Sequence, residues 1–166
     1  YTNGTPMRIL FSAHGLPERI VAKGDPYPEQ IEMTAAAIVQ KLGNENLDWT
    51  VCYQSRVGPL EWIGPATDDE IRRAGNDGKG VIVVPVAFVS EHSETLVELD
   101  MDYAELARHV GVPDYLRAAT VRDHPDFIAG LAALVSVGLN AKKPVSCHPS
   151  RTCPLGTSCG QDGARA

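Results

Sequence analysis

Two places in the sequence put side chains that could do chemistry shortly after an apolar run, a histidine at the first and a histidine with carboxylates at the second. His14 follows the run over residues 7–12, and His92 and Glu94 follow the run over residues 80–89. A neutral imidazole can accept a proton near pH 7, and imidazole and carboxylate together bind borderline divalent cations. The residue types therefore indicate proton transfer or metal binding. For His14 considered alone, the alternative is a loop histidine that only satisfies backbone groups.

Three acidic residues, Glu94, Glu98 and Asp102, lie at four-residue intervals within the region 91–109, which we expect to be one helix. At this spacing they share a helix face, where like charges repel by roughly 0.2–0.5 kcal/mol per pair. A purely structural surface would more often carry Lys or Arg at one of these positions. The functional interpretation is a row of carboxylates that passes a cation inward, with His92 at the same mouth. The alternative is a solvated acidic face.

Three of the four cysteines cluster near the C-terminal end of the sequence. They are Cys147, Cys153 and Cys159, in the pattern C-x5-C-x5-C. A cytosolic chain seldom uses cysteines for structural disulfides, so this cluster favours metal binding. Zinc is less favoured, because its sites commonly use shorter CxxC pairs, and reactive surface thiols are the alternative. Cys52 stands apart within an expected strand, where a buried and inert thiol is the common case.

Apolar strand-like runs alternate with helical patterns through residue 139. Strands are expected over residues 7–12, 49–54, 80–89 and 115–119, and helices over residues 29–42, 67–74, 91–109 and 125–139. This alternation predicts a three-layer α/β domain over residues 1–139, in which helices flank a four-stranded parallel sheet. Residues 140–166 lose the periodicity and form a Cys-rich tail. Ligands of such folds bind beyond the carboxyl ends of the strands, so His14 and Glu94 are expected to meet over one pocket.

Composition and motifs argue against several classes of function. Hydrophobic residues make up 43% and charged residues 22%, which allows a packed core and argues against global disorder. The net charge of −6 argues against nucleic-acid binding, and no GxGxxG or Walker loop supports nucleotide binding. No apolar run approaches the roughly 20 residues that span a bilayer, and no signal peptide is evident. We therefore expect a cytoplasmic protein, and Tyr1 in place of a starting Met suggests a piece of a longer one.

Three blocks of sequence resemble the ferrochelatase family. They are FSAHGLP at residues 11–17 with GDPYP at 24–28, YQSRVGP at 53–59 with WIGP at 62–65, and VPVAFVSEHSETLVELD at 84–100. The resemblance covers most of residues 7–103 and extends more weakly to about residue 139. It implies a Rossmann-like chelatase domain that forms the C-terminal half of a two-domain enzyme around a porphyrin cleft. Two departures are Glu91, where the family usually has Asp, and Gly15, where it commonly has Ser.

The resemblance also implies an activity and its participants. The expected reaction is insertion of ferrous iron into protoporphyrin IX to form protohaem, a lyase step of haem and porphyrin biosynthesis. The family pattern makes His14 and Glu94 the catalytic pair, with His14 as the candidate proton acceptor. The candidate metal ligands are His14, Glu94, His92, Glu98 and Asp102. The partners are protoporphyrin IX, ferrous iron, a peripheral membrane surface and the N-terminal domain, whose absence from residues 1–166 predicts little activity for the chain alone.

The resemblance extends to the cysteine cluster. Many ferrochelatases hold a 2Fe–2S cluster near the C-terminus, so Cys147, Cys153 and Cys159 are its expected ligands here. Such a cluster takes four thiolates. The fourth is either Cys52 or a cysteine before residue 1, and the family pattern favours the second. Two other functions stay open: a related cobalt or coproporphyrin chelatase, and a non-catalytic metal-binding or redox-sensing module on the same fold.

Overall fold

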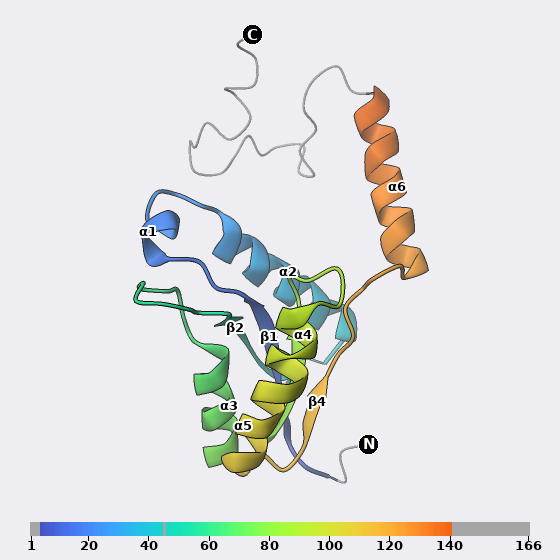
Figure 1. Cartoon of the computed structure of the whole chain (residues 1–166). Coiled ribbons are helices and arrows are strands. Elements are labelled where there is room, and N and C mark those ends of the chain that lie inside the picture. Colours follow the sequence, from blue (N-terminus) through green and yellow to red (C-terminus); the bar gives the residue numbers. More distant parts are fainter. Residues whose placement is uncertain (1–3, 45, 141–166) are drawn as a thin grey trace. The chain divides into compact units, whose positions relative to one another are not determined.

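The computed structural model of the chain describes residues 4–44 and 46–140, and its first compact unit ends at Thr120. This unit is built on a sheet of four parallel strands in the order β2-β1-β3-β4 (Figure 1). The strands are β1 (Met7–His14), β2 (Asp48–Gln54), β3 (Gly80–Pro85) and β4 (Tyr115–Arg117). The predicted α/β fold with a four-stranded parallel sheet is confirmed.

The central strand β1 lies between β2 and β3 and carries much of the core. Its apolar residues are buried on both faces, and Leu10 and Phe11 are fully inaccessible to solvent. Successive strand residues point to opposite faces of a sheet. Leu10 therefore packs into one apolar cluster and Phe11 into another. The two clusters lie on opposite faces of the sheet, as a three-layer arrangement requires.

Each face of the sheet has its own helices (Figure 1). One face is covered by α2 (Tyr27–Leu42), which buries Ile31 and Ala35 in the cluster around Phe11. The other face is covered by α3 (Thr67–Asn76), the π-helical segment η1 (Glu98–Tyr103) and α5 (Ala104–His109). Helix α2 ends at Gly43, whose φ of 68° is a left-handed conformation that glycine adopts without a steric penalty.

The region 91–109, predicted as one long helix, consists of three segments. A short helix α4 (Ser93–Leu96) precedes η1, and α5 follows it. The helix widens in η1, where the Asp102 N–H reaches back five residues to the Val97 carbonyl at 3.0 Å. Such wide turns are rare and occur frequently at functional sites. The prediction of a continuous helix was wrong, because helix propensity does not register the tertiary contacts that this segment makes.

Several elements end at other residues than expected. Strand β1 continues to His14, so this side chain projects from the end of the strand rather than from a loop. Strand β3 stops early at Pro85, and the Val86 N–H just beyond it still donates to the Ser12 carbonyl of β1 at 3.0 Å. The chain then turns, with the Phe88 N–H donating to the Pro85 carbonyl at 3.2 Å. Between β1 and α2 lies a short helix, α1 (Glu18–Val21), that was not predicted.

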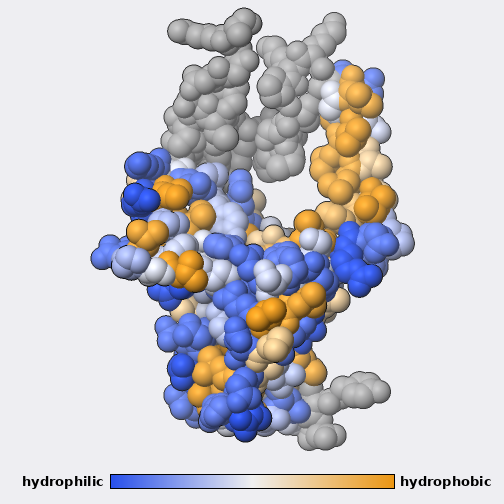
Figure 2. Space-filling view, in the orientation of Figure 1, coloured by the Kyte–Doolittle hydropathy of each residue, from blue (hydrophilic) through white to orange (hydrophobic). Residues whose placement is uncertain are grey.

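The second unit contains α6 (Pro125–Asn140), which confirms the helix expected there. Apolar residues recur along the whole of α6 (Figure 2). Among the helices of the described residues, none is long and apolar enough to cross a membrane. The Cys-rich tail predicted for residues 140–166 lies, apart from Asn140, outside the described residues. The domain boundary expected after residue 139 stays a prediction.

Candidate active site

His14 and Glu94 meet at the carboxyl end of the sheet. Nε2 of His14 lies 3.4 Å from Oε1 of Glu94, and each side chain is a little over a third exposed. Nδ1 of His14 lies 2.7 Å from the carbonyl oxygen of Gly15. A carbonyl only accepts hydrogen bonds, so Nδ1 carries the hydrogen of the neutral ring and Nε2 keeps its lone pair. The ring is therefore set to accept a proton at Nε2, beside the Glu94 carboxylate.

Contacts from β2 and α2 fix the backbone around His14. The Gly15 N–H donates to the Gln54 carbonyl at 2.8 Å, and the Tyr27 hydroxyl donates to the His14 carbonyl at 3.0 Å. Burial raises the pKa of Tyr27, which keeps the phenol protonated as this donor. Gly15 is closely packed, because a Cβ at this position would lie 3.2 Å from the Trp62 ring. Neighbouring backbone thus sets the position of the partly exposed His14 ring.

His92 caps the first turn of α4. Its Nδ1 accepts the N–H of Glu94 at 3.2 Å, and its own N–H donates to the Thr95 hydroxyl at 2.9 Å. The His92 ring packs on Phe88, with ring centroids 5.1 Å apart. Nδ1 of His92 also lies 3.7 Å from Oε2 of Glu94. In the neutral ring this nitrogen is engaged by the backbone, so His92 orients the residue that faces His14.

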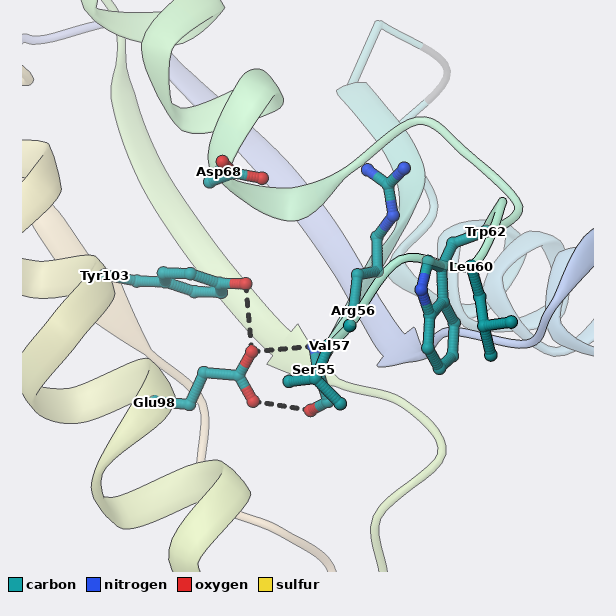
Figure 3. Close-up of a pocket in the computed structure, with 9 residues that line it drawn as sticks. Ser55, Arg56, Val57, Leu60, Trp62, Asp68, Glu98 and Tyr103 are labelled. Atoms are coloured by element: carbon teal, nitrogen blue, oxygen red, sulfur yellow. Dashed lines mark hydrogen bonds between the residues drawn. The ribbon is translucent and has the colours of Figure 1, made fainter.

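Glu98 turns toward the end of β2, where four hydrogen bonds hold its carboxylate. Oε1 accepts from the Ser55 N–H at 2.7 Å and from the Tyr103 hydroxyl at 3.0 Å (Figure 3). Oε2 accepts from the Ser55 hydroxyl at 2.5 Å and from the Gln54 amide at 3.0 Å. Burial, together with the charge of Glu98, raises the pKa of Tyr103, so this phenol remains a donor. The widened helix η1 therefore docks onto β2 through one carboxylate.

An open cleft of about 470 Å³ lies at the His14–Glu94 pair. Its polar lining includes His14, Glu94 and Asp102, and its apolar lining includes Val57, Trp62 and Val97. A second hollow of about 400 Å³ adjoins it and also contains Arg56 and Asp68 (Figure 3). The two hollows share Ser55, Val57, Trp62 and Glu98. Apolar side chains beside a proton acceptor and carboxylates suit a largely apolar molecule with an ionisable centre.

The sequence of the chain places these residues in a known family, since a family model for ferrochelatases matches residues 1–139. The chain belongs to the ferrochelatase family. The ferrochelatase of Caulobacter vibrioides is 62% identical over 136 residues, which are 81% of this chain and 39% of that protein. The ferrochelatases of Phenylobacterium zucineum and Rickettsia bellii are 60% and 46% identical over 76% and 89% of this chain, and over 36% and 42% of their own lengths. The chain thus spans about two fifths of the length of these relatives.

A solved structure supports the fold of this ferrochelatase-family chain. A cobalamin (vitamin B12) biosynthesis CbiX protein from Marinobacter aquaeolei superposes with a TM-score of 0.58 and 21% sequence identity. The match covers 81% of this chain and 98% of that one. At this identity the likeness concerns the fold alone. The family match confirms the resemblance seen in the sequence, and this structure supports the chelatase-like α/β fold.

The predicted iron ligands of this ferrochelatase-family chain are only partly brought together. Glu94 lies within ion-pair distance of both His14 and His92. Asp102 lines the same cleft, whereas the carboxylate of Glu98 is engaged by its protein donors. Within residues 4–44 and 46–140, no three or more His, Cys, Asp or Glu side chains are grouped closely enough to hold a metal ion. The assignment of the metal ligands stays a prediction.

The predicted cluster ligands Cys147, Cys153 and Cys159 lie outside the described residues. Cys52, one of the two candidates for the fourth ligand, is fully buried, and burial raises the pKa of its thiol to about 12. The Thr67 hydroxyl donates to its Sγ at 3.3 Å. A cluster ligand has to be a thiolate that the metal can reach. The surroundings of Cys52 do not fit that role and are those of a structural thiol.

Glu91 anchors the loop before α4 to β4. Its Oε1 accepts from Arg117 at 2.8 Å and from the Thr120 N–H at 3.1 Å. Arg117 also pairs with Asp100 at 2.6 Å. Although burial opposes ionisation, the hydrogen bonds from Arg117 and Thr120 lower the pKa of Glu91 to about 2. Glu91, one of the two departures from the family resemblance, is therefore a carboxylate anchor for Arg117 and Thr120.

Three residues that shape the site were not predicted from the sequence: Gln54 and Ser55 at the end of β2, and Tyr103 in η1. All three donate hydrogen bonds to Glu98. The block YQSRVGP offered a signal for the first two, since it places polar residues directly after an apolar strand, as at His14. Tyr103 carried no such signal, because its contact depends on the widened helix.

Proposed function

We propose that the protein containing this chain is a ferrochelatase that inserts ferrous iron into protoporphyrin IX, the lyase reaction that forms protohaem. The observation that carries the proposal is the 3.4 Å approach of His14 Nε2 to Glu94 in an open cleft with apolar flanks. Membership of the ferrochelatase family supports the reaction class. Because the chain spans only part of the length of its relatives, we assign the activity to the whole protein.

The proposed chemistry begins with proton removal. One Fe²⁺ ion replaces two pyrrole protons, which have to leave the macrocycle. His14 accepts a proton at Nε2, and the resulting imidazolium is stabilised by the carboxylate of Glu94 at 3.4 Å. Glu94 then passes this proton toward the open side of the cleft, which returns His14 to its neutral form for the second proton. The pair thus supplies both the base and the exit route.

A second division of labour fits the same geometry. In it Glu94 delivers the ferrous ion, which is a substrate, while His14 alone takes the protons. Asp102 lines the same cleft and extends the acidic approach for a cation. The variant Glu94→Gln separates the two cases in steady-state kinetics. A lower kcat with an unchanged KM for iron indicates support of His14, and a raised KM for iron indicates delivery.

The apolar side chains of the cleft are proposed to hold one face of the porphyrin. Val57, Trp62 and Val97 line the cleft beside the catalytic pair. Val57 is 72% exposed and Val97 is 45% exposed, so both present apolar surface that a macrocycle would cover. We assign the opposite wall to a part of the protein outside residues 1–166, the N-terminal domain of the expected two-domain enzyme.

Two finer parts of the proposal rest on the family resemblance alone. Cys147, Cys153 and Cys159 are proposed to bind a 2Fe–2S cluster with a fourth thiolate from outside residues 1–166, because Cys52 does not fit. The protein is proposed to work in the cytoplasm, in peripheral contact with the membrane, into which its apolar porphyrin substrate partitions.

The test is a metal-insertion assay with protoporphyrin IX and ferrous iron under anaerobic conditions, with zinc as a stable substitute. The complete open reading frame that encodes this chain is compared with residues 1–166 alone and with the complete protein carrying His14→Ala. Insertion by the complete protein that His14→Ala abolishes supports the proposal. No insertion by the complete protein with either metal contradicts it and favours the non-catalytic module. Parallel reactions with cobalt and with coproporphyrin decide between the related chelatases.

A further inference from the structure

We propose that Gln54 is a positioning residue of this reaction: its side-chain amide holds the backbone of Glu94 and the carboxylate of Glu98, and thereby sets the distance between Glu94 and His14. The effect of Gln54 on catalysis rests on the proposed function. The position that Gln54 gives to Glu94 and Glu98 rests on hydrogen bonds alone. Gln54 is the last residue of β2 and is completely buried.

The amide nitrogen of Gln54 connects the sheet to the α4–η1 region. Nε2 lies 2.8 Å from the Glu94 carbonyl oxygen and 3.0 Å from Oε2 of Glu98. A carbonyl and a carboxylate only accept hydrogen bonds, so each amide hydrogen has one acceptor and the amide cannot be reversed. Both donors of this buried group are therefore satisfied by residues that lie 40 and 44 positions away in the sequence.

The other end of the amide is fixed by buried hydroxyl groups. Oε1 of Gln54 accepts from the Ser12 hydroxyl at 2.8 Å, and Oγ of Ser12 lies 2.9 Å from Oγ1 of Thr67. All three side chains are fully buried. A change of the Gln54 rotamer would leave several buried polar atoms without partners, which is costly. This rigidity is what a positioning residue requires.

Gln54 also supports the opposite partner, His14. The two residues are register partners in the parallel β1–β2 pair. The Gln54 carbonyl accepts the Gly15 N–H at 2.8 Å, and the Gly15 carbonyl lies 2.7 Å from Nδ1 of His14. The backbone of Gln54 thus orients the His14 ring while its side chain holds Glu94. Both sides of the 3.4 Å approach between Nε2 and Oε1 depend on one residue.

Glu98 is the second anchor of this arrangement. An ionised carboxylate offers about four acceptor positions. Donors from Gln54, Ser55 and Tyr103 make four hydrogen bonds to it. A metal ion would have to displace one of these donors. In this arrangement Glu98 holds η1 on the end of β2 instead of binding iron.

The test uses Gln54→Met and Gln54→Glu in the complete protein, with Gln40→Met at an exposed glutamine of α2 as the matched control. Methionine keeps the side-chain length and removes both donors. Glutamate keeps the acceptor for Ser12 and removes the donors to Glu94 and Glu98. We expect kcat for metal insertion to fall about 10- to 100-fold in both Gln54 variants, while the KM and Kd for porphyrin stay within about twofold.

Two kinetic outcomes would overturn the proposal. One is a kcat within about twofold of the wild type in a folded Gln54 variant. The other is a loss of activity matched by an equal loss of porphyrin binding, which marks general damage to the fold. A fall in kcat alone in either Gln54 variant, with Gln40→Met unaffected, supports the proposal.

Hydrogen exchange gives a second readout that needs no activity. The amides of α4 and η1 should lose protection in both Gln54 variants and keep it in Gln40→Met. Unchanged protection in the Gln54 variants contradicts the anchoring itself. Absence of metal insertion by the wild-type protein contradicts the proposed function instead, and the exchange result still decides whether Gln54 holds this region.

Discussion

The imidazole of His14 and the carboxylate of Glu94 come from different layers of the fold and approach to 3.4 Å. His14 ends a strand that is paired on both sides, and Glu94 lies in the first turn of a helix that His92 caps. Neither side chain is held by its own burial, since each is more than a third exposed. Their approach depends instead on the Gly15 carbonyl and on the amide of Gln54. Changes to these contacts should alter catalysis more than porphyrin binding.

Replacing His14 by alanine should lower kcat for metal insertion by about 10²- to 10⁴-fold, because the cleft loses the group proposed to accept the pyrrole protons. Porphyrin affinity should change little, because the apolar lining of the cleft is kept. The measurement is the initial rate of zinc insertion by the complete protein, with porphyrin binding followed by fluorescence. His109→Ala is the matched control, since His109 is exposed and contacts Glu105 of its own helix. Equal rates in the two variants would exclude His14 as the base.

That His14 and Glu94 lie close together could be predicted from the sequence, whereas the residues that hold their backbone could not. Apolar runs that end in polar residues marked His14 and Glu94, because a strand buried on both faces has a signal independent of distant contacts. In the sequence Gln54 looks like any polar residue after a strand. Its importance comes from contacts with residues 40 and 44 positions away, which no local pattern encodes.

The arrangement of the three carboxylates in this region also could not be predicted from local sequence. Glu94, Glu98 and Asp102 share one face only if the helix keeps 3.6 residues per turn. The widened segment η1 breaks that assumption, and Glu98 reaches the end of β2, where Ser55 and Tyr103 donate to it. Helix propensity alone predicts a regular helix here, because the contacts that accompany the widening come from another part of the chain.

The salt bridge between Glu91 and Arg117 should make stability depend on acid pH. The pKa of Glu91 is lowered from 4.5 to about 2 in the folded chain by this contact and by the Thr120 N–H, against the effect of burial. Between these values the unfolded carboxyl binds a proton that the folded one does not. The stabilisation is therefore complete above pH 4.5 and is lost as the pH falls toward about 2.

The measurement for this prediction is urea unfolding of the chain across that range of pH. Glu91→Gln should make the free energy of unfolding depend less on pH in this acidic range, because it removes the titrating group. Glu61→Gln, at an exposed glutamate, is the control and should leave the pH dependence of the free energy of unfolding unchanged. If the free energy of unfolding of the wild type depends on acid pH no more steeply than that of Glu91→Gln, the contact with Arg117 does not persist in solution.

Asparagine at position 92 should serve almost as well as histidine, whereas alanine should not. His92 acts through Nδ1, which accepts the N–H of Glu94 at 3.2 Å, and asparagine is among the best N-cap residues. We expect His92→Ala to lower the free energy of unfolding by about 1 kcal/mol in urea titrations, and His92→Asn to lower it much less. Metal insertion should follow the same order. A stably folded His92→Asn protein that has lost insertion would instead support the predicted role of His92 as a metal ligand.

Cys52 should be inert in the folded protein and dispensable for the proposed cluster. Burial raises the pKa of its thiol to about 12, so the reactive thiolate is scarce near neutral pH, and the side chain is inaccessible. Iodoacetamide should leave Cys52 unlabelled by peptide mass spectrometry until urea unfolds the chain. In the complete protein, Cys52→Ala should keep the visible absorbance of the 2Fe–2S cluster, and Cys153→Ala should abolish it. Loss of the absorbance in Cys52→Ala would make Cys52 the fourth ligand, which would require β2 to part from Thr67 in the assembled protein.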